Sequence, residues 1–456
     1  MSSDKKRNNH TEMAGLRPGD VFTAEISGYT HDGWGVARLG QRVIFIQGVL
    51  RGELVQAEIS SQRRGVFYAR LLQIVQSAPE NRRQSPLCPV YDGCGGCQLQ
   101  HMTYAEELYF KQEQVVSALQ RLGGFSAAEL SVMRPIIAAA PKQLYHYRNK
   151  GIFHVSRDAA GYSLSFWNEE THSPAAAACQ LLFPEKVNQL IARLRQGDLP
   201  NGVSDVMLRY SFASQRLMLF LRFSEASAEQ LAVARIFLQQ ISAEFADLLV
   251  WGVQTPKGWQ TFSPVGFLTD TLGNVHYQIA PEAFFQVNNA QTMCLLSVLQ
   301  TALSAKTEFL LDAYCGIGTL GIYLARHLPG LRRLWGIELN AGAVENARQN
   351  AELNQLANAK FWQGKAENEF DKILKQNHCI DAVIIDPPRR GCHKQLLHGL
   401  LQLRPKQLVY VSCNPSTLAR DLQLLCAEKY TLSLVQPVDM FPRTHHVETI
   451  CVLSRI

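Results

Sequence analysis

The C-terminal third of the chain carries the clearest pattern of apolar and polar positions. From Phe309 onward, short continuous apolar runs alternate with segments of helical periodicity. The runs are FLLDAY, RRLWGIEL, KFWQG, CIDAVIID, QLVYVSC and VETICVL. Continuous apolar strands separated by helices are typical of a parallel sheet, because such a sheet is covered by helices on both faces. The pattern therefore predicts an α/β domain in this part of the chain.

The N-terminal part has a different pattern, with short strands of alternating apolar and polar residues broken by glycine. Between Asp20 and about Val75 these strands are VFTAEISGY, GWGVAR, RVIFIQGVL, ELVQAEIS and VFYARLLQIV. Alternation with glycine between the runs predicts a small closed antiparallel barrel.

The surface of the predicted barrel carries both charge and aromatic rings. Six arginines are scattered through it: Arg38, Arg42, Arg51, Arg63, Arg64 and Arg70. Tyr29, Trp34 and Tyr68 are available to stack on bases. A nucleic-acid-binding face and an ordinary solvated surface explain these residues equally well, since arginine is common on protein surfaces.

The remaining segments are less informative. Residues 1–12 read as a solvated tail, and the polar segment 77–87, with its prolines and serines, reads as a linker. A helix is expected from about Thr103 to the Gly123-Gly124 pair. Residues 130–280 mix strands and helices without clear repetition.

Composition limits the possible classes of protein. A length of 456 residues predicts two or three domains, and 46% hydrophobic with 18% charged residues is typical of globular proteins. With no run of eighteen apolar residues and no apolar signal core at the start, we expect a cytoplasmic protein. Its 11 cysteines are then expected to be reduced thiols rather than disulfides. The net charge of +6 permits a polyanionic partner without requiring one.

The first strand of the α/β region ends in a glycine-rich turn, Asp312-Ala-Tyr-Cys-Gly-Ile-Gly-Thr319. Such a turn lets the backbone approach a ligand at the carboxyl edge of the sheet. Glu338 ends the second strand, where a carboxylate can accept hydrogen bonds from ribose hydroxyls, and Asp386 ends the fourth. These features suit a dinucleotide and S-adenosylmethionine equally well. The polar residues at the catalytic edge favour S-adenosylmethionine.

Two residues near the same edge are candidates for chemistry. Cys413 follows the fifth strand and is either a nucleophile or a buried structural cysteine, with equal weight on position alone. Glu448 stands just before the last strand, next to His445 and His446. A partly desolvated carboxylate can serve as a general base, although a lone glutamate is more commonly a surface residue.

A compact cysteine cluster, Cys88-x5-Cys94-x2-Cys97, lies in a glycine-rich segment. Three thiolates leave a tetrahedral or cuboidal metal site one ligand short, and the spacing does not name the fourth. Zinc and an iron–sulfur cluster both remain open at this point.

Residues 284–456 resemble the catalytic domain of RNA uracil-5-methyltransferases. The resemblance rests on five motifs in order: FFQVNNAQT, LDAYCGIGTLGIYLA, DPPRRGC, VSCNPSTLARDL and PVDMFPRTHHVE. The N-terminal barrel resembles a TRAM domain, an RNA-binding module of that family, and with the cysteine cluster it points to the 23S ribosomal RNA branch. The resemblance implies an OB-like barrel at 13–76, an α+β iron–sulfur domain at 77–280 and a Rossmann-like class I methyltransferase domain at 281–456.

The resemblance also implies residue roles. Cys413 would be the nucleophile, Glu448 the base that removes the C5 proton, and Cys179 the fourth ligand of a [4Fe–4S] cluster, favoured over zinc. The positions that match S-adenosylmethionine contacts are Gln286, Tyr314, Thr319, Glu338, Lys365 and Asp386. The implied activity is methylation of uridine C5 in 23S ribosomal RNA through a covalent bond from cysteine to C6. The uridine is then expected to be flipped out or in a loop, and the enzyme to be a monomer.

Three other functions remain to be separated from this one. An amino-methyltransferase that acts on adenine or cytosine needs no cysteine and carries an aromatic residue after its Asp-Pro-Pro, whereas Arg389 stands there in this chain. A non-enzymatic RNA-binding factor would have no need of Cys413 and Glu448. Within the enzyme class, transfer RNA is the alternative substrate.

Overall fold

The computed structural model describes residues 16–78, 82–158, 161–167, 174–175, 179, 181–197, 199–375 and 379–456. The tail expected at 1–12 lies outside these residues. The chain divides into two compact units, one with residues up to Pro86 and Leu99–Phe110, the other with Leu87–Gln98 and Lys111–Ile456. Within the described part, no helix is long and apolar enough to cross a membrane.

The first unit contains a closed five-stranded barrel in the order β1-β2-β3-β5-β4. Its strands are β1 (Val21–Tyr29), β2 (Gly35–Leu39), β3 (Arg42–Ile46), β4 (Leu54–Arg63) and β5 (Val66–Gln76). Alternate side chains, among them Ile26, Ala37, Ile44 and Val55, fill the interior and are almost fully buried. The closed barrel predicted from the alternating pattern is confirmed, but it is not wholly antiparallel, because β3 and β5 pair in parallel.

Polar contacts join the barrel to the predicted linker and to the segment that follows it. Arg83 forms an ion pair with the fully buried Glu53 at 2.7 Å. Glu106, near the start of helix α1 (Tyr104–Arg121), accepts hydrogen bonds from the Tyr29 hydroxyl and the Arg51 guanidinium, both at 2.7 Å. Tyr29 therefore serves the interior of this unit, not a base-stacking surface, because burial and Glu106 hold its hydroxyl in place.

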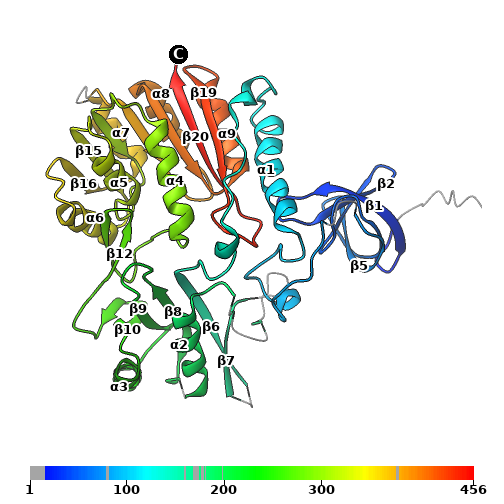
Figure 1. Ribbon diagram of the computed structural model, residues 1–456, viewed down its shortest axis with the longest axis horizontal. Helices are drawn as coiled ribbons and strands as arrows, with labels where there is room; N and C mark the ends of the chain where they lie inside the picture. The colour runs from blue at the N-terminus through cyan, green and yellow to red at the C-terminus, as the bar shows by residue number, and fades with distance from the viewer. Residues whose placement is uncertain are drawn as a thin grey trace, which may run out of the picture. The chain divides into compact units, whose positions relative to one another are not determined.

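A six-stranded mixed sheet forms the centre of the chain, in the order β11-β10-β9-β8-β6-β7. The strands are β6 (Lys150–Asp158), β7 (Gly161–Ser165), β8 (Val203–Tyr210), β9 (Leu217–Phe223), β10 (Leu248–Thr255) and β11 (Gly258–Thr261). Helices α2 (Glu185–Gln196) and α3 (Ala228–Glu244) cover one face (Figure 1), with Leu190 and Leu238 in the shared core. This is the mixed α+β region that the sequence predicted.

The C-terminal sheet has seven strands in the order β16-β15-β14-β17-β18-β20-β19. The strands are β14 (Phe309–Asp312), β15 (Arg333–Glu338), β16 (Ala359–Gln363), β17 (Ala382–Ile385), β18 (Gln407–Ser412), β19 (Tyr430–Val438) and β20 (Glu448–Arg455). The first five are parallel to one another, whereas β20 runs antiparallel to both β18 and β19. All six predicted strands are present, and β19 is an addition. A two-stranded sheet, β12 (Leu268–Leu272) with β13 (Val275–Ile279), precedes them.

Helices cover both faces of this sheet (Figure 1), as expected for continuous apolar strands. One face packs against α4 (Asn289–Ala302), α5 (Thr319–His327) and α6 (Ala341–Leu353). The other packs against α7 (Ala366–Lys375), α8 (Lys394–Leu403), α9 (Pro415–Cys426) and the later residues of α1. The class of α/β fold predicted from the sequence is confirmed.

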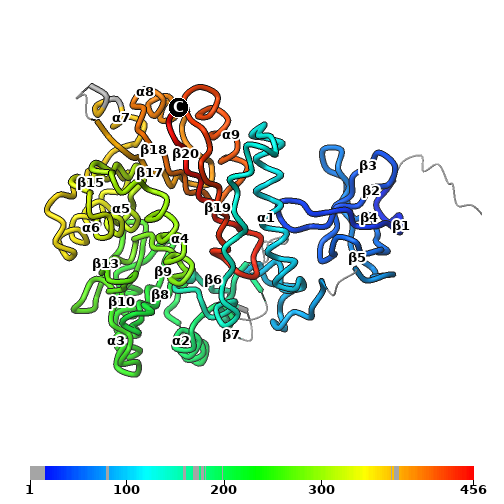
Figure 2. Tube along the Cα trace, turned by 45° about the horizontal axis from the view of Figure 1, so that its top comes forward, coloured from blue at the N-terminus to red at the C-terminus, as the bar shows by residue number. Residues whose placement is uncertain are grey.

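The edge strand β19 is covered by a segment from elsewhere in the chain. Met133 pairs with Val435 and Ile137 pairs with Val438 in parallel bridges, and the segment that follows α1 runs beside β19 in Figure 2. Covering an edge strand in this way satisfies its backbone and prevents it from pairing with other molecules. Short 3-10 helices are also described at Tyr91–Gly93, Glu129–Val132 and Pro141–Gln143.

Candidate active site

Five polar side chains meet at the carboxyl edge of the C-terminal sheet. Asp312 and Glu338 end β14 and β15, while Asp386 and Cys413 immediately follow β17 and β18. Parallel strands bring these ends to one edge, where such folds bind ligands. Because β20 is antiparallel, its first residue, Glu448, lies at the same edge. The structure therefore brings together residues that are far apart in the sequence.

The glycine-rich turn after β14 is tight because two of its glycines have left-handed backbones. Gly316 has φ +54°, and Gly318, which caps α5, has φ +84°. A Cβ on Gly318 would lie 2.5 Å from the Ile322 side chain. Below the turn, the buried Asp312 carboxylate accepts a hydrogen bond from the Gly321 N–H at 3.1 Å. The turn thus leaves backbone N–H groups at the start of α5, beside Thr319, close to the edge of the sheet.

The other predicted cofactor contacts differ in how they are held. The Glu338 carboxylate accepts hydrogen bonds from the N–H groups of Gly316 (3.2 Å) and Asn340 (2.8 Å), so it braces the glycine turn. Tyr314 is half-buried, and this burial raises the pKa of its hydroxyl. Lys365 is exposed in the turn before α7.

Gln286 lies before α4 in a segment tied to the central sheet. It is half-buried, and its carbonyl accepts a hydrogen bond from Asn149 Nδ2 at 2.9 Å. Asn149 belongs to the basic and aromatic segment that leads into β6, and its N–H donates to the Val287 carbonyl at 2.9 Å. The central sheet therefore positions the Gln286 segment.

Cys413 is a partly exposed thiol in an environment that disfavours its charged form. Burial and the carboxyl groups of Glu448 and Asp386 together raise the pKa of Cys413 to about 11, against the lowering effect of Arg389. At pH 7 a pKa of 11 leaves about one thiol in 10,000 ionised, less than in free cysteine. The position suits a nucleophile, but these neighbours alone do not activate the thiol.

Glu448 and Asp386 form a coupled acidic pair beside this thiol. Glu448 is almost fully buried, and burial raises its pKa well above the ordinary value; Asp386 raises it further and Arg389 lowers it. Asp386 is densely surrounded by protein, which raises its pKa to about 7. A raised pKa makes each carboxyl group a stronger proton acceptor once it is ionised, which is what a general base requires.

Arg389 is a member of the site that the sequence did not single out. Its charge lowers the pKa of both Cys413 and Glu448, and its Nη2 lies 3.1 Å from His446 Nε2. Burial lowers the pKa of His446 to about 3, so this imidazole is neutral and its Nε2 accepts the hydrogen bond. The available signal was the Asp-Pro-Pro-Arg sequence, which places a cation three residues after Asp386.

The loop from Asp439 to Val447, which leads into Glu448, is anchored at three points. Lys111 Nζ lies 2.5 Å from Asp439 Oδ1, and both side chains are fully buried. Asn288 Nδ2 donates to the Met440 carbonyl, and the Tyr147 hydroxyl donates to the Pro442 carbonyl, each at 3.0 Å. The position of Glu448 therefore depends on α1, α4 and the segment before β6.

Of the four cysteines of the predicted cluster, Cys88 and Cys94 lie close enough to Cys179 to affect its thiol. Burial and the neighbouring Cys94 and Cys88 thiols together raise the pKa of the Cys179 thiol to about 11. Backbone N–H groups approach two sulfurs: Gly96 donates to Cys94 and Leu182 donates to Cys179, each at 3.4 Å. In the described segments, however, no three cysteine, histidine or carboxylate side chains stand close enough to hold a metal ion.

Comparison with known proteins shows extensive similarity. A family model described as tRNA (Uracil-5-)-methyltransferase matches residues 268–456, and the TRAM domain matches residues 16–72. An uncharacterized RNA methyltransferase of Bacillus cereus is 34% identical over 449 residues, covering 94% of this chain and 95% of the relative. One from Gloeobacter violaceus is 34% identical over 466 residues, covering 97% of this chain and 98% of the relative.

Among solved structures, the tRNA (uracil-54, C5)-methyltransferase of Pyrococcus abyssi in complex with S-adenosyl-L-homocysteine superposes with a TM-score of 0.70. It is 25% identical, and the match covers 95% of this chain and 100% of that one. The similarity therefore extends over nearly the whole chain.

Proposed function

Since this chain belongs to the uracil-5-methyltransferase family of RNA methyltransferases, we propose that it methylates carbon 5 of a uridine in RNA with Cys413 as the nucleophile. One observation carries the proposal: Cys413, Glu448 and Asp386 meet at the edge of the sheet that also holds the glycine-rich turn. A thiol, a base and a cofactor turn in one place match the needs of this reaction.

The chemistry assigns a separate task to each residue. Uracil C5 is too weak a nucleophile to take a methyl group unaided. The Cys413 thiolate adds to C6, which places electron density on C5. C5 then forms a bond to the methyl carbon as the bond from that carbon to the donor breaks. Glu448 then removes the C5 proton, the C5–C6 double bond re-forms and the thiolate leaves. S-adenosylmethionine would supply an electrophilic methyl group on a sulfonium.

The residues at the glycine turn fit that methyl donor. Glu338 and the first turn of α5 with Thr319 would hold the nucleoside end, because a carboxylate accepts from ribose hydroxyls. Asp386, Gln286 and Tyr314 would bind nearer the reacting sulfur, and Lys365 would lie near the adenine. The unpartnered Oδ1 of the buried Asp312, within the described part, also suits a cationic ligand.

The barrel supports an RNA substrate through its outer face. The Phe45 and Tyr68 rings lie 5.8 Å apart, and Trp34 packs edge-on against Tyr68 at 5.7 Å. All three rings are partly exposed, and the Arg63 guanidinium lies 5.9 Å from the Tyr68 ring. Partly exposed aromatic rings with a neighbouring arginine are a common platform for single-stranded bases.

We propose 23S ribosomal RNA as the substrate, on the combination of barrel and cysteine cluster. Transfer RNA is the second candidate, because the similar Pyrococcus abyssi enzyme is a tRNA methyltransferase and its match covers 95% of this chain. The barrel alone therefore does not discriminate. Mapping 5-methyluridine in both RNA classes from cells with and without the gene decides between them, since only the true substrate loses the modification.

We also propose that Cys88, Cys94, Cys97 and Cys179 together hold a [4Fe–4S] cluster. Four thiols suit iron, and backbone N–H groups directed at two of the sulfurs stabilise the thiolate form. Binding would have to draw the sulfurs together, because in the described segments no three of them stand close enough to hold a metal ion. The role would be structural, because methyl transfer needs no electron transfer. Protein purified without oxygen should be brown and absorb near ~400 nm, with iron that is lost in Cys179→Ser. Colourless protein loaded with zinc would contradict the cluster.

The thiol mechanism is tested with RNA that contains 5-fluorouridine. Fluorine at C5 cannot be removed as a proton, so the covalent adduct should persist on the peptide that carries Cys413. Cys413→Ala should form no adduct, whereas Cys294→Ala, at a half-buried cysteine on α4, should behave like the wild type. Full activity of Cys413→Ala would favour an amino-methyltransferase. A pure RNA-binding factor would release no tritium from C5-labelled uridine.

A further inference from the structure

The loop between β17 and α8 contains a tight turn that carries Arg389. The Gly391 N–H donates to the Pro388 carbonyl at 2.8 Å, and Gly391 has φ +77°. A Cβ at Gly391 would lie 2.5 Å from Arg420 Nη2 and 2.7 Å from Asp421 Oδ2. The turn is therefore packed directly against two side chains of α9, and only glycine fits there.

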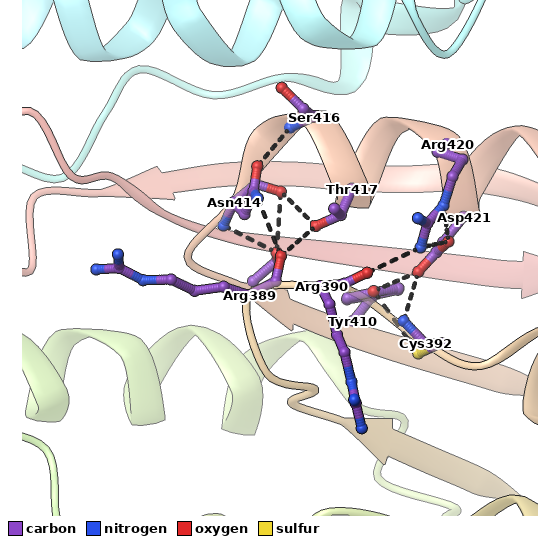
Figure 3. Close-up of polar contacts among 10 residues, drawn as sticks. Arg389, Arg390, Cys392, Tyr410, Asn414, Ser416, Thr417, Arg420 and Asp421 are labelled. Atoms are coloured by element: carbon purple, nitrogen blue, oxygen red, sulfur yellow. Dashed lines mark hydrogen bonds and ion pairs between the residues drawn. The ribbon is translucent and has the colours of Figure 1, made fainter. Parts of the chain in front are cut away.

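Both inner carbonyls of this turn are held by groups from the Cys413 side of the site (Figure 3). The Arg389 carbonyl accepts hydrogen bonds from Asn414 Nδ2 at 2.9 Å and Thr417 Oγ1 at 3.2 Å. The Arg390 carbonyl accepts one from Arg420 Nη2 at 3.1 Å. Since Asn414 directly follows Cys413, the turn and the nucleophile are fixed to the same helix.

Asp421 is the centre of this network. It is fully buried, and its Oδ2 accepts hydrogen bonds from the Cys392 N–H and the Tyr410 hydroxyl, each at 2.8 Å. Its Oδ1 accepts one from Arg420 Nε at 2.8 Å. One carboxylate thus joins the loop after β17, the strand β18 that ends at Cys413, and α9 (Figure 3).

We propose that Asp421 is a positioning residue for methyl transfer, which clamps the Pro388–Cys392 turn to α9 and so keeps the Arg389 cation beside Cys413. The inference rests on the proposed function of Cys413 but concerns a residue that touches neither substrate nor cofactor. The alternative to this positioning role is that the Asp421 carboxylate only stabilises the fold.

The two alternatives differ in the charge felt by the thiol. Arg389 lowers the pKa of Cys413 against the raising effects of burial and two carboxyl groups. If the turn is released, the cation moves away, and the thiolate becomes rarer at every pH below the thiol pKa. A merely structural loosening would instead expose Cys413 and make it more reactive.

The experiment compares Asp421→Asn with a matched control, Asp381→Asn. Asp381 also accepts two backbone N–H groups, from Glu308 and Phe309 at 3.0 Å, and pairs with Lys406 at 2.7 Å. It precedes β17 and lies at the opposite edge of the sheet. Asp381→Asn therefore perturbs stability without disturbing the turn.

Alkylation of Cys413 is followed by peptide mass spectrometry between pH 7.5 and 9.5, with the exposed Cys379 as internal reference. Asp421→Asn should slow the reaction with iodoacetamide about threefold, because a pKa raised by one pH unit lowers the thiolate fraction about tenfold and the more basic thiolate recovers about threefold. Reaction with the anionic iodoacetate should fall further, because the cation that attracts it has moved. Asp381→Asn should change neither rate.

Turnover gives a second measurement on the full-length enzyme. We expect kcat to fall about tenfold in Asp421→Asn while the KM values for RNA and S-adenosylmethionine stay within about twofold. If Asp421→Asn does not fold, Arg420→Met replaces it, since this exposed arginine holds the Arg390 carbonyl and pairs with Asp421 but leaves the bonds of Asp421 to Cys392 and Tyr410 in place. Its shift should be smaller and in the same direction.

Unchanged or faster alkylation of Cys413 in the clamp variants, or an equal loss in Asp381→Asn, would overturn the proposal. The alkylation needs neither RNA nor cofactor. Wild-type protein that failed to methylate uridine would therefore refute the proposed function while the clamp remained measurable.

Discussion

Lys111→Met should strongly destabilise the second unit, because it leaves the buried Asp439 carboxylate without its cation. The two charges are 2.5 Å apart and both side chains have 0% exposure. At this distance the attraction is about 7 kcal/mol for an effective dielectric constant of ~20. Removing each ion from water costs several kcal/mol, so the intact pair contributes a net free energy near zero. Removing one partner alone costs about 3–5 kcal/mol.

Urea denaturation followed by circular dichroism measures this cost as a loss in the free energy of unfolding. Lys186→Met is the control: Lys186 pairs with Asp247 at a similar 2.6 Å, but the side chains are 34% and 38% exposed. It should cost less than about 1 kcal/mol.

The double variant Lys111→Met/Asp439→Leu tests the physical reason. With both charges gone, most of the lost stability should return, since no buried ion is left unpaired. A Lys111→Met cost below about 1 kcal/mol, or a double variant as unstable as the sum of the singles, would refute the reasoning.

Three further outcomes follow from the same geometry. Glu448→Gln should accumulate the covalent RNA adduct, because addition by Cys413 proceeds while proton removal is blocked; rapid turnover would move the base elsewhere. Binding of S-adenosylmethionine should release protons and tighten as pH rises through about 7, where the pKa of Asp386 lies, since a cation favours the ionised carboxylate; calorimetric enthalpies that do not depend on the buffer would contradict this. Gly391→Ala should cost about 2–4 kcal/mol, combining backbone strain with the contacts at 2.5 and 2.7 Å, whereas Gly65→Ala, with φ +82° and open space, should cost about 1 kcal/mol in a thermal melt.

The strands that the sequence predicted are those whose own residues form a continuous apolar run. Runs such as AVII in β17 are apolar at every position, because both faces of the sheet are covered. The strand β19 was missed because its first half alternates with polar residues and Pro437 lies near its end. It is held by pairing with β20 and by the segment around Met133, which no local pattern reveals.

The candidate site divides in the same way. Cys413, Asp386 and Glu448 were accessible from the sequence, because strand ends in a parallel sheet share one edge whatever the loops do. Lys111 was not, since its partner Asp439 is 328 residues away and a lysine in a helix is normally solvated. Arg389 was visible but not interpretable, because its effect depends on a turn held by side chains of α9.

The electrostatics of the site explain why residues that are distant in the sequence matter. Burial raises the pKa of the Cys413 thiol to about 11 from an ordinary 9.0. Two pH units reduce the thiolate fraction about a hundredfold, and the greater intrinsic nucleophilicity of a more basic thiolate recovers only about tenfold. The deficit of about tenfold must be met by positive charge near the sulfur.

The pKa of about 11 already includes the lowering effect of Arg389 on Cys413. In the proposed reaction the further positive charge therefore comes from the sulfonium of the methyl donor when it binds. The same charge drives ionisation of Asp386 and Glu448, so the base and the nucleophile become active together. A site built from these acids therefore depends on the cationic donor for its activity, which would protect a partly exposed thiol from wasteful reactions between turnovers.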